Sequence, residues 1–355
     1  MGDRLIIGIE KELSGFRLMI DLSIAAEIFV LFGPSGSGKT QILNALAGLM
    51  NPDRGEIRLD GRTLFRSLDD SVTINLPTRE RRMAMVFQQY ALFPHLTARE
   101  NVAYPLRKDK SNADRLLQRM QLDHLAGRYP YELSGGQQQR VAIARALAAD
   151  AKVLLLDEPF SALDRPIRDQ LHRELIALQE ETGLVIVYVT HSLDDAMTAG
   201  NRVAIINGGR IEQVSSLTEI FTHPRNRSVL EIIGVPNVIN GTIKEDGLEW
   251  AGLSLVTKVQ QKGRLGEVVT AYVPSEEITI EGIDGEVNGS LDDSHQNRFR
   301  GRVVRSQASG LVQRHWVELP NRQLIESAQR DGRRYLNGEM VEVKIPADRI
   351  IFVEK

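Results

Sequence analysis

The stretch GPSGSGKT at residues 33–40 decides the class of fold for the first part of the chain. It follows a short apolar run, EIFVLF (27–32), and opens KTQILNALAGL, whose apolar spacing predicts a helix ending at Gly48. A glycine-rich turn between a strand and a helix presents backbone N–H groups and the positive end of the helix dipole to phosphate oxygens. A flexible Gly/Ser linker, the alternative interpretation, has no reason to stand between a buried strand and an amphipathic helix.

The stretch fits the pattern G-x-x-x-x-G-K-[ST] of a phosphate-binding loop, so specific roles follow for its last residues. Lys39 is expected to reach the β- and γ-phosphates of a nucleotide, and the Thr40 hydroxyl is expected to bind Mg²⁺. The candidate ATP contacts here are Gly33, Pro34, Ser35, Gly36, Ser37, Gly38, Lys39, Thr40 and Gln41.

Two further apolar runs, KVLLL (152–156) and LVIVYV (184–189), predict strands covered on both faces, as in parallel sheets. Between them, Ile167, Leu171, Leu175 and Leu178 form one helical stripe. The first part of the chain is therefore predicted to be an α/β unit with crossover helices. Further along, RVAIINGGRIEQV predicts a hairpin that turns at Asn207-Gly208-Gly209.

Polar residues follow the predicted strands where they would meet the phosphate loop. Asp157 ends one strand and is expected to hold Mg²⁺, and Glu158, next along, is expected to act as general base toward water. His191 follows the next strand and is expected to contact the γ-phosphate or Glu158. Gln88, after MAMVF, is expected to orient water or Mg²⁺. Acids at a strand end can also mark a surface loop, and a lone histidine can be structural.

Composition limits the remaining possibilities. The 355 residues carry a net charge of −3, which gives no electrostatic footprint for nucleic acid, and include no cysteine, which excludes thiolate metal sites. The first residues, MGDRLIIGIEKEL, lack a signal-peptide core, and no uncharged apolar run approaches the roughly 18 residues that span a bilayer. A membrane role would therefore come through a partner.

After Pro236 the sequence changes to short alternating strands that contain an internal repeat. GEVVTAYVPSEEITIE (266–281) matches GEMVEVKIPADRIIFVE (338–354), and NVINGTI (237–243) matches NRFRGRV (297–303). Two copies of a small β unit are predicted, although chance similarity between hairpin-rich strands is the alternative.

A second glycine-rich turn, LSGGQQQR (133–140), lies about a hundred residues after the first. GPSGSGKT, Gln88, LSGGQQQR, VLLLDEP, SALD and His191 stand in the order and spacing of an ABC-transporter ATP-binding subunit, which residues 1–234 resemble. The resemblance implies a P-loop (RecA-like) ABC ATPase domain over 1–234 with a helical subdomain at about 91–150. A small all-β, OB-like regulatory domain with two mop-type repeats is expected over 235–355.

The resemblance also implies that the ATP sites are shared between two copies of the chain. Ser134, Gly135, Gly136 and Gln137 are expected to contact ATP bound by the other subunit of a homodimer, and Asp164 is expected to lie across the interface. An N-terminal helix end with free N–H groups suits that role, although a serine N-cap with a loop glycine pair is common by itself. Phe16 stands where the family has a tyrosine stacked on adenine; a core position is the alternative.

A single ATPase unit without a fused span resembles importers, which implies two integral-membrane permease subunits, an extracytoplasmic substrate-binding protein and a peripheral position at the cytoplasmic face of the membrane. Residues 90–96 are candidate permease contacts. ABC ATPases of DNA repair or translation are the alternative class, but their coiled coils, zinc cysteines or second ATPase unit are not present in this sequence.

The C-terminal repeat resembles the regulatory domain of such importers, and SHQNRFRGRVV (294–304) is similar to the opening of molybdate-binding modules. Molybdate or tungstate is therefore the expected substrate, with sulfate, ferric ion and spermidine as alternatives. Ser294, Asn297 and Asn237 are the candidate oxyanion ligands, since hydroxyl and amide donors suit a tetrahedral anion. Here His295 and Gln296 replace the module's Ala-Arg, and both asparagines could instead cap turns.

Overall fold

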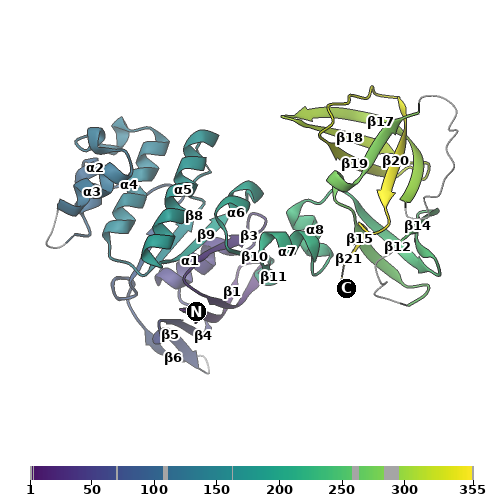
Figure 1. The fold of residues 1–355 in the computed structure, drawn as a ribbon. Helices are drawn as coiled ribbons and strands as arrows, with labels where there is room; N and C mark the ends of the chain where they lie inside the picture. The colour runs from purple at the N-terminus through teal and green to yellow at the C-terminus, as the bar shows by residue number, and fades with distance from the viewer. Residues whose placement is uncertain are drawn as a thin grey trace. The chain divides into compact units, whose positions relative to one another are not determined.

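The computed structural model describes residues 2, 4–68, 71–106, 111–161, 163–257, 264–283 and 296–353 (Figure 1). The chain forms two compact units that divide between Thr218 and Glu219. The sequence predicts the boundary later, at 234/235. The helix between these two points packs with the second unit, because Leu230 joins Tyr272 and Val353 in one buried cluster.

The first unit is built on one sheet with the strand order β6-β5-β4-β1-β2-β11-β10-β3-β9-β8-β7. The strands are β1 (Leu5–Leu13), β2 (Phe16–Ile24), β3 (Ile28–Phe32), β4 (Arg54–Leu59), β5 (Arg62–Leu68), β6 (Ser71–Asn75), β7 (Met83–Val86), β8 (Val153–Asp157), β9 (Val185–Thr190), β10 (Arg202–Asn207) and β11 (Arg210–Ser215). The hairpin expected at Asn207-Gly208-Gly209 is formed by β10 and β11, and both glycines have positive φ.

The parallel part of this sheet aligns the ends of five strands. β3 pairs in parallel with β9 and with β10, β9 pairs with β8, and β8 pairs with β7. In this register Phe32 lies beside Thr190, and Asp157 lies beside Val189. Segments far apart in the sequence therefore leave the sheet at one edge, where ligands bind in open α/β sheets.

Helices cover the sheet, and those in the stretch of chain that connects β7 to β8 form a separate layer (Figure 1). That layer contains α2 (Ala98–Ala103), α3 (Ser111–Arg119), the short 3₁₀ turns η2 (Asp123–Leu125) and η3 (Pro130–Glu132), and α4 (Gly135–Ala148). The other helices are α1 (Lys39–Ala47), η1 (Thr78–Glu80), α5 (Arg165–Thr182) and α6 (Leu193–Ala199). Leu171, Leu175 and Leu178 of the predicted stripe are buried on α5.

The position of α1 is fixed at its core face and at its end. Ile42, Leu43 and Leu46 are fully buried against the sheet. The Arg81 guanidinium, itself buried, donates to the carbonyl oxygens of Ala45 (2.7 Å) and Leu46 (3.0 Å) at the C-terminus of the helix. Because a cation there satisfies carbonyls that the helix leaves unpaired, the loop preceding α1 has a rigid support.

The second unit contains two five-stranded antiparallel sheets. α7 (Leu217–Thr222) lies at the division and α8 (Arg227–Ile233) follows it. The strands are β12 (Val238–Lys244), β13 (Gly247–Trp250), β14 (Leu253–Val256), β15 (Val268–Tyr272), β16 (Thr279–Gly282), β17 (Gln296–Ser309), β18 (Val312–Glu318), β19 (Leu324–Gln329), β20 (Met340–Pro346) and β21 (Ile351–Val353), with η4 (Ser275–Glu277) before β16.

The two sheets exchange their last strands. The first has the order β14-β13-β12-β15-β21 and the second β16-β20-β17-β18-β19, so β16 completes the second sheet and β21 completes the first. One buried core joins residues from both sheets, including Ile239, Val269, Val303 and Val341. The repeated stretches of sequence thus supply equivalent strands to two interlocked sheets.

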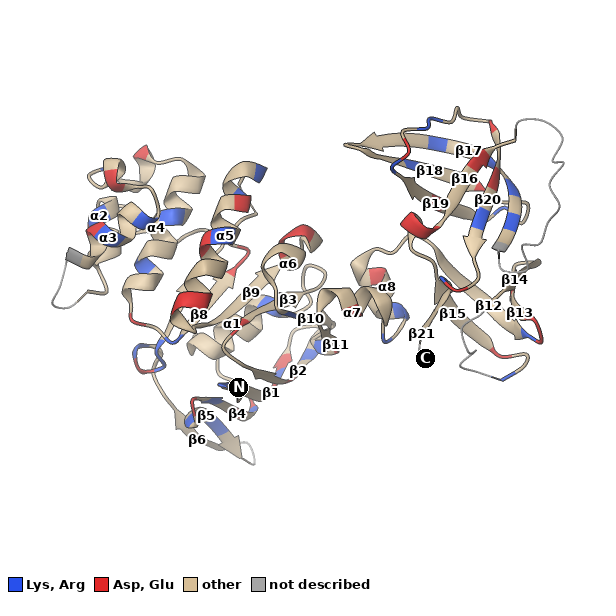
Figure 2. Ribbon diagram, viewed as in Figure 1, with Lys and Arg blue, Asp and Glu red and all other residues tan. Residues whose placement is uncertain are grey.

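Two further features of the described residues are the distribution of charged side chains and the composition of the helices. Figure 2 shows Lys and Arg interspersed with Asp and Glu along both units. Among the helices of the described residues, none combines the length and apolar composition needed to cross a membrane.

Candidate functional site

The turn between β3 and α1 requires glycine at two places for different reasons. A Cβ on Gly33 would lie 2.1 Å from the carbonyl oxygen of Ile206, so the backbone approaches too closely for any side chain. Gly38, which precedes α1, has φ of 104°, a conformation that side chains rarely adopt. The loop geometry therefore follows from the glycine spacing.

The Lys39 side chain lies along this loop and is only 6% exposed. Its Nζ donates to the carbonyl oxygens of Gly33 (2.9 Å) and Pro34 (2.8 Å). Burial lowers the pKa of Lys39, and the nearby carboxylates of Glu158 and Asp157 oppose this shift. A buried ammonium with acids close by is suited to phosphate oxygens, which replace lost hydration with charge-assisted hydrogen bonds.

Asp157 lies at the end of β8, beside the first turn of α1. Its Oδ1 accepts a hydrogen bond from Thr40 Oγ1 at 3.2 Å. Burial raises the pKa of Asp157, while the bond from Thr40 acts against this shift. A hydroxyl and a carboxylate at this spacing fit Mg²⁺, which takes oxygen ligands and keeps waters and substrate phosphates in its remaining positions. Within the described ranges, no group of three or more His, Cys, Asp or Glu offers a complete metal cage.

Glu158 and His191 form a pair at the same edge. Nδ1 of His191 lies 3.1 Å from Oε1 of Glu158; the Glu158 side chain is 19% exposed and that of His191 58%. Glu158 has φ of 46°, unusual for a residue other than glycine, and its N–H donates to the Val189 carbonyl at 3.1 Å. Strained backbone held in this way is concentrated at functional sites. The carboxylate is thereby aimed at the loop.

These side chains line one cavity of about 480 Å³, named here the loop pocket. Its lining residues are Leu13, Ser14, Phe16, Ser35, Gly36, Gly38, Lys39, Thr40, Gln41, Gln88, Glu158 and His191. Phe16 and six of the nine residues predicted from the phosphate loop are therefore brought together, and Gly33 and Pro34 are joined to them through the Lys39 contacts.

The loop pocket also includes residues that the sequence reasoning missed. Leu13 ends β1, and Ser14 follows it in the turn that leads to Phe16 at the start of β2. The Phe16 ring packs on the loop, since a Cβ on Gly38 would lie 3.2 Å from its Cε2. Phe16 is half-buried, so it lines the pocket wall and also packs against the edge of the core. The turn that precedes Phe16 in the sequence could have indicated that Leu13 and Ser14 line the same pocket.

The second glycine-rich turn forms the N-terminus of α4. Ser134 Oγ accepts from the Gln137 N–H at 3.3 Å, and the Gln137 side chain accepts from the Ser134 N–H at 2.9 Å. Ser134 and Gly135 are exposed, and Gly136 packs against Leu163. Asp164 caps α5, accepting from the Ile167 N–H at 3.4 Å. Of Ser134, Gly135, Gly136, Gln137 and Asp164, none lines the loop pocket.

The segment after Gln88 is fastened to α4. Arg145 donates to the carbonyl oxygens of Tyr90 (3.1 Å) and Ala91 (2.8 Å), and its guanidinium lies 5.3 Å from the Phe93 ring centroid. Tyr90 and Ala91 both have positive φ. One side chain of α4 therefore stabilises the corner that follows Gln88.

In the second unit, the candidate oxyanion residues have other partners. Asn237 Nδ2 donates to Ser275 Oγ (3.3 Å) and to the Glu326 carbonyl (2.8 Å). Asn297 Nδ2 donates to the carbonyls of Val256 (3.0 Å) and Ile345 (3.1 Å). Both amides are buried and both use their two hydrogens, so anion binding there would first have to break a structural bond. Ser294 lies outside the described residues.

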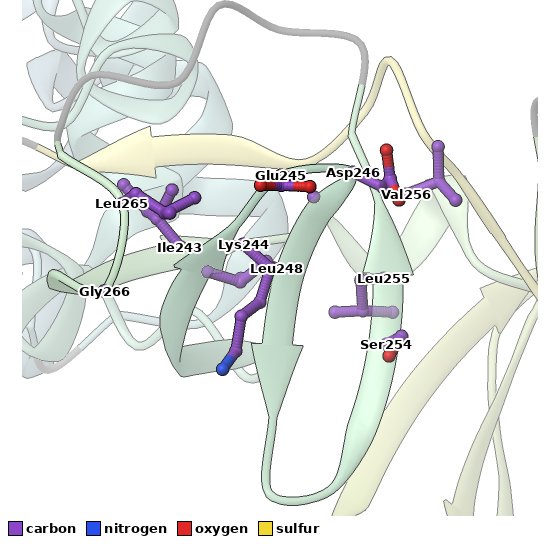
Figure 3. Close-up of a pocket in the computed structure, with 11 residues that line it drawn as sticks. Ile243, Lys244, Glu245, Asp246, Leu248, Ser254, Leu255, Val256, Leu265 and Gly266 are labelled. Carbon is purple, nitrogen blue, oxygen red and sulfur yellow. The ribbon is translucent and has the colours of Figure 1, made fainter.

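A second cavity, of about 580 Å³, lies in the second unit around the β12–β13 turn, β14 and Leu265 (Figure 3). Leu248, Leu255 and Leu265 form its apolar lining, and Glu245 and Asp246 lie at the turn. It contains neither Asn237 nor Asn297. The two carboxylates disfavour an oxyanion, and Lys244, which also lines the cavity, is paired with Glu249 at 2.9 Å, so this cavity gives the predicted anion site no support.

A nucleotide loop, strand-end acids and a serine-capped second glycine turn define an ATPase of the ABC class. Residues 20–161 match the ABC transporter family, and residues 256–353 match the TOBE domain. The chain is 36% identical over 338 residues to the spermidine/putrescine import ATP-binding protein PotA of Nitrosospira multiformis, which covers 91% of this chain and 89% of that protein. The chain belongs to the ATP-binding proteins of ABC transporters and is an ABC-type ATPase.

Other relatives agree on the class but differ in named substrate. The chain is 43% identical over 278 residues to the sulfate/thiosulfate import ATP-binding protein CysA of Xylella fastidiosa, covering 75% of this chain and 77% of that one. A solved dimeric structure of the ATP-binding cassette MJ0796 bound to ADP and Pi is 32% identical, with a TM-score of 0.51 over 60% of this chain and 98% of that chain. The expected preference for molybdate finds no support in these relatives.

Proposed function

We propose that this chain hydrolyses ATP to drive an importer, and the loop pocket is the observation that carries the proposal. The N–H groups of the loop and Lys39 bind the phosphates of ATP, Phe16 stacks on the adenine, and Gln41 lines the same pocket. Thr40 and Asp157 would hold Mg²⁺, with Gln88 lining the same pocket as Thr40, and the ion would neutralise charge on the phosphates.

In this proposal Glu158 takes the proton from the attacking water and His191, 3.1 Å away, holds the Glu158 carboxylate and contacts the γ-phosphate. The positive φ of Glu158 directs the carboxylate toward the loop without a change of conformation. Gln88 orients the water. The chemistry therefore depends on placement of one base beside a phosphate already held by the loop.

The homodimer completes each site. Ser134, Gly135, Gly136 and Gln137 are exposed or half-exposed at the N-terminus of α4 and lie outside the loop pocket of their own chain. We infer that they bind the γ-phosphate held by the other chain, with Asp164 at the interface, because free N–H groups at a helix end favour an anion.

The membrane part of the importer is supplied by two permease subunits, with an extracytoplasmic substrate-binding protein, and this chain sits at the cytoplasmic face of the membrane. Residues 90–96 are the proposed permease contact. Their attachment to α4 through Arg145 offers a direct route from that contact to Ser134.

For the substrate, spermidine or putrescine replaces molybdate as the favoured reading. The match to the spermidine/putrescine protein of Nitrosospira multiformis extends over 91% of the chain, and so includes the second unit. Sulfate is the second candidate, because the Xylella fastidiosa relative is more identical over a shorter length.

Uptake measurements test both the transported substrate and the role of ATP hydrolysis. Cells lacking this chain are supplied with labelled putrescine, spermidine, sulfate or molybdate, and are complemented with the natural chain or with Glu158→Gln. Restoration of polyamine uptake by the natural chain alone is expected. Restored sulfate or molybdate uptake would overturn the polyamine assignment, and equal restoration by Glu158→Gln would overturn the role of ATP hydrolysis.

A further inference from the structure

A buried carboxylate lies behind the Glu158–His191 pair. Asp195, on α6, is 3% exposed. Its Oδ2 accepts hydrogen bonds from Tyr188 Oη and from Thr190 Oγ1, each at 3.2 Å. Both donors come from β9, whose last residue, Thr190, immediately precedes His191. The carboxylate therefore fastens the end of the strand to the start of the next helix.

The same hydroxyl organises the turn that carries His191. Thr190 Oγ1 accepts from the Ser192 N–H at 3.0 Å, and Ser192 Oγ accepts from the Asp195 N–H at 3.2 Å. The residues on both sides of His191 are thus tied to Asp195, one directly and one through a cap. Since His191 itself is largely exposed, these bonds are what fix its backbone.

The network extends to the neighbouring loops. Arg168 of α5 donates to the Leu163 carbonyl at 2.8 Å, and its Nη1 lies 3.8 Å from Asp195 Oδ1. The Phe160 ring, two residues beyond Glu158, packs edge-on against His172 and Tyr188. Asp195 thus stands where the segments carrying Glu158, Asp164 and His191 meet.

Stability alone gives a weak reason for such an arrangement. Burying a carboxylate costs several kcal/mol, and apolar residues of similar volume often stabilise a fold as well or better. Oδ1 of Asp195 has no hydrogen-bond partner closer than the 3.7 Å to His172 and the 3.8 Å to Arg168. The hydrogen bonds that Asp195 does make join it to Tyr188, Thr190 and Ser192, and the last two residues flank His191.

We infer that Thr190 and Asp195 are positioning residues for His191, and through it for Glu158. The inference rests on the role proposed for His191. The Thr190 hydroxyl donates to Asp195 and accepts from Ser192, so it holds the imidazole in line with the Glu158 carboxylate. Loss of that hydroxyl lets the turn adopt other conformations and lowers the fraction of molecules with an aligned base.

The experiment is a double-mutant cycle on ATP turnover by the full chain. Thr190→Val, which keeps the side-chain volume, is expected to lower kcat about tenfold with KM for ATP within about twofold, the pattern of a lost transition-state interaction. Thr190→Ser keeps the hydroxyl and is expected to retain kcat within about twofold. Thr198→Val, which removes an exposed hydroxyl from the same helix as Asp195, is the matched control.

The decisive comparison is made in a His191→Ala background, with residual turnover followed by release of labelled phosphate. There Thr190→Val is expected to change kcat by less than about twofold, because its effect passes through the missing imidazole. An equal loss in both backgrounds, or a normal kcat for Thr190→Val, would overturn the inference. Full activity of His191→Ala would instead overturn the proposed role of His191, so the two failures are distinguishable.

Discussion

The two glycine-rich turns of the first unit differ in how many functional side chains of the same chain surround each one. The turn at 33–40 is surrounded by strand ends that supply Asp157, Glu158 and His191, all aligned by the register of β8, β3 and β9. The turn at Ser134 has a complete capping box yet faces solvent. In the proposed homodimer, the second turn would complete the loop pocket of the other chain. Four predictions test this difference.

The largest effect is expected at Glu158, within the loop pocket. Glu158→Gln should lower kcat by roughly 10²- to 10⁴-fold, the range attributed to a positioned general base, and leave ATP binding intact. Turnover and nucleotide affinity are measured on the same preparations. Glu180→Gln, an exposed acid on α5, is the control. Near-normal turnover by Glu158→Gln would show that another group activates the water.

A smaller effect is expected at Lys39, where ATP binding should be weakened as well as turnover. Lys39→Ala removes a charge-assisted contact to phosphate and should weaken ATP binding by about 10- to 100-fold. Titration with a fluorescent ATP analogue measures the change. An unaltered affinity would mean that the backbone N–H groups alone hold the phosphates.

The comparison is tested most directly by mixing variants. Ser134→Arg and Lys39→Ala chains should each be nearly inactive, but a heterodimer contains one site with both residues intact. An equal mixture should regain about a quarter of the natural turnover, since half of the dimers carry one of two sites. Turnover by the natural chain should also rise more steeply than linearly with protein concentration, because only the dimer is active. A linear dependence without restoration would place Ser134 in the site of its own chain.

The smallest effect is expected at Phe16, on the wall of the loop pocket. Phe16→Ala should weaken ATP binding about three- to tenfold through lost ring contact, whereas Phe16→Tyr should change it less than twofold. Comparing ATP with inorganic triphosphate identifies the cause. If both ligands lost affinity equally, the ring would act on the loop and not on the base.

Local patterns predicted the phosphate loop, the apolar strands and the hairpin at Asn207-Gly208-Gly209, because each is specified by neighbouring residues. The network around Asp195 could not be found in this way. Thr190 and Asp195 meet within one local turn, but Arg168 reaches them from α5, and only the packing of α5 against α6 shows that contact.

The C-terminal asparagines illustrate a different limit. Asn237 and Asn297 were recognised as equivalent positions in a repeat, but their spacing does not reveal their partners. Each amide bonds to backbone across the repeats, Asn237 to Glu326 and Asn297 to Val256. A donor that suits an anion suits a carbonyl equally well. The assignment of α8 to the second unit depends in the same way on a distant contact, between Leu230 and Tyr272.

The strand exchange in the second unit has a consequence for how the protein is made. β15 forms its outer ladder with β21, through Thr270–Val353 and Tyr272–Ile351, so its edge stays unpaired until β21 has left the ribosome. An open edge of this kind can pair with another nascent chain. The first unit is complete in sequence by Thr218 and can fold during translation, whereas the second must wait for the synthesis of β21. Loss of β21 would therefore leave the edge of β15 permanently exposed.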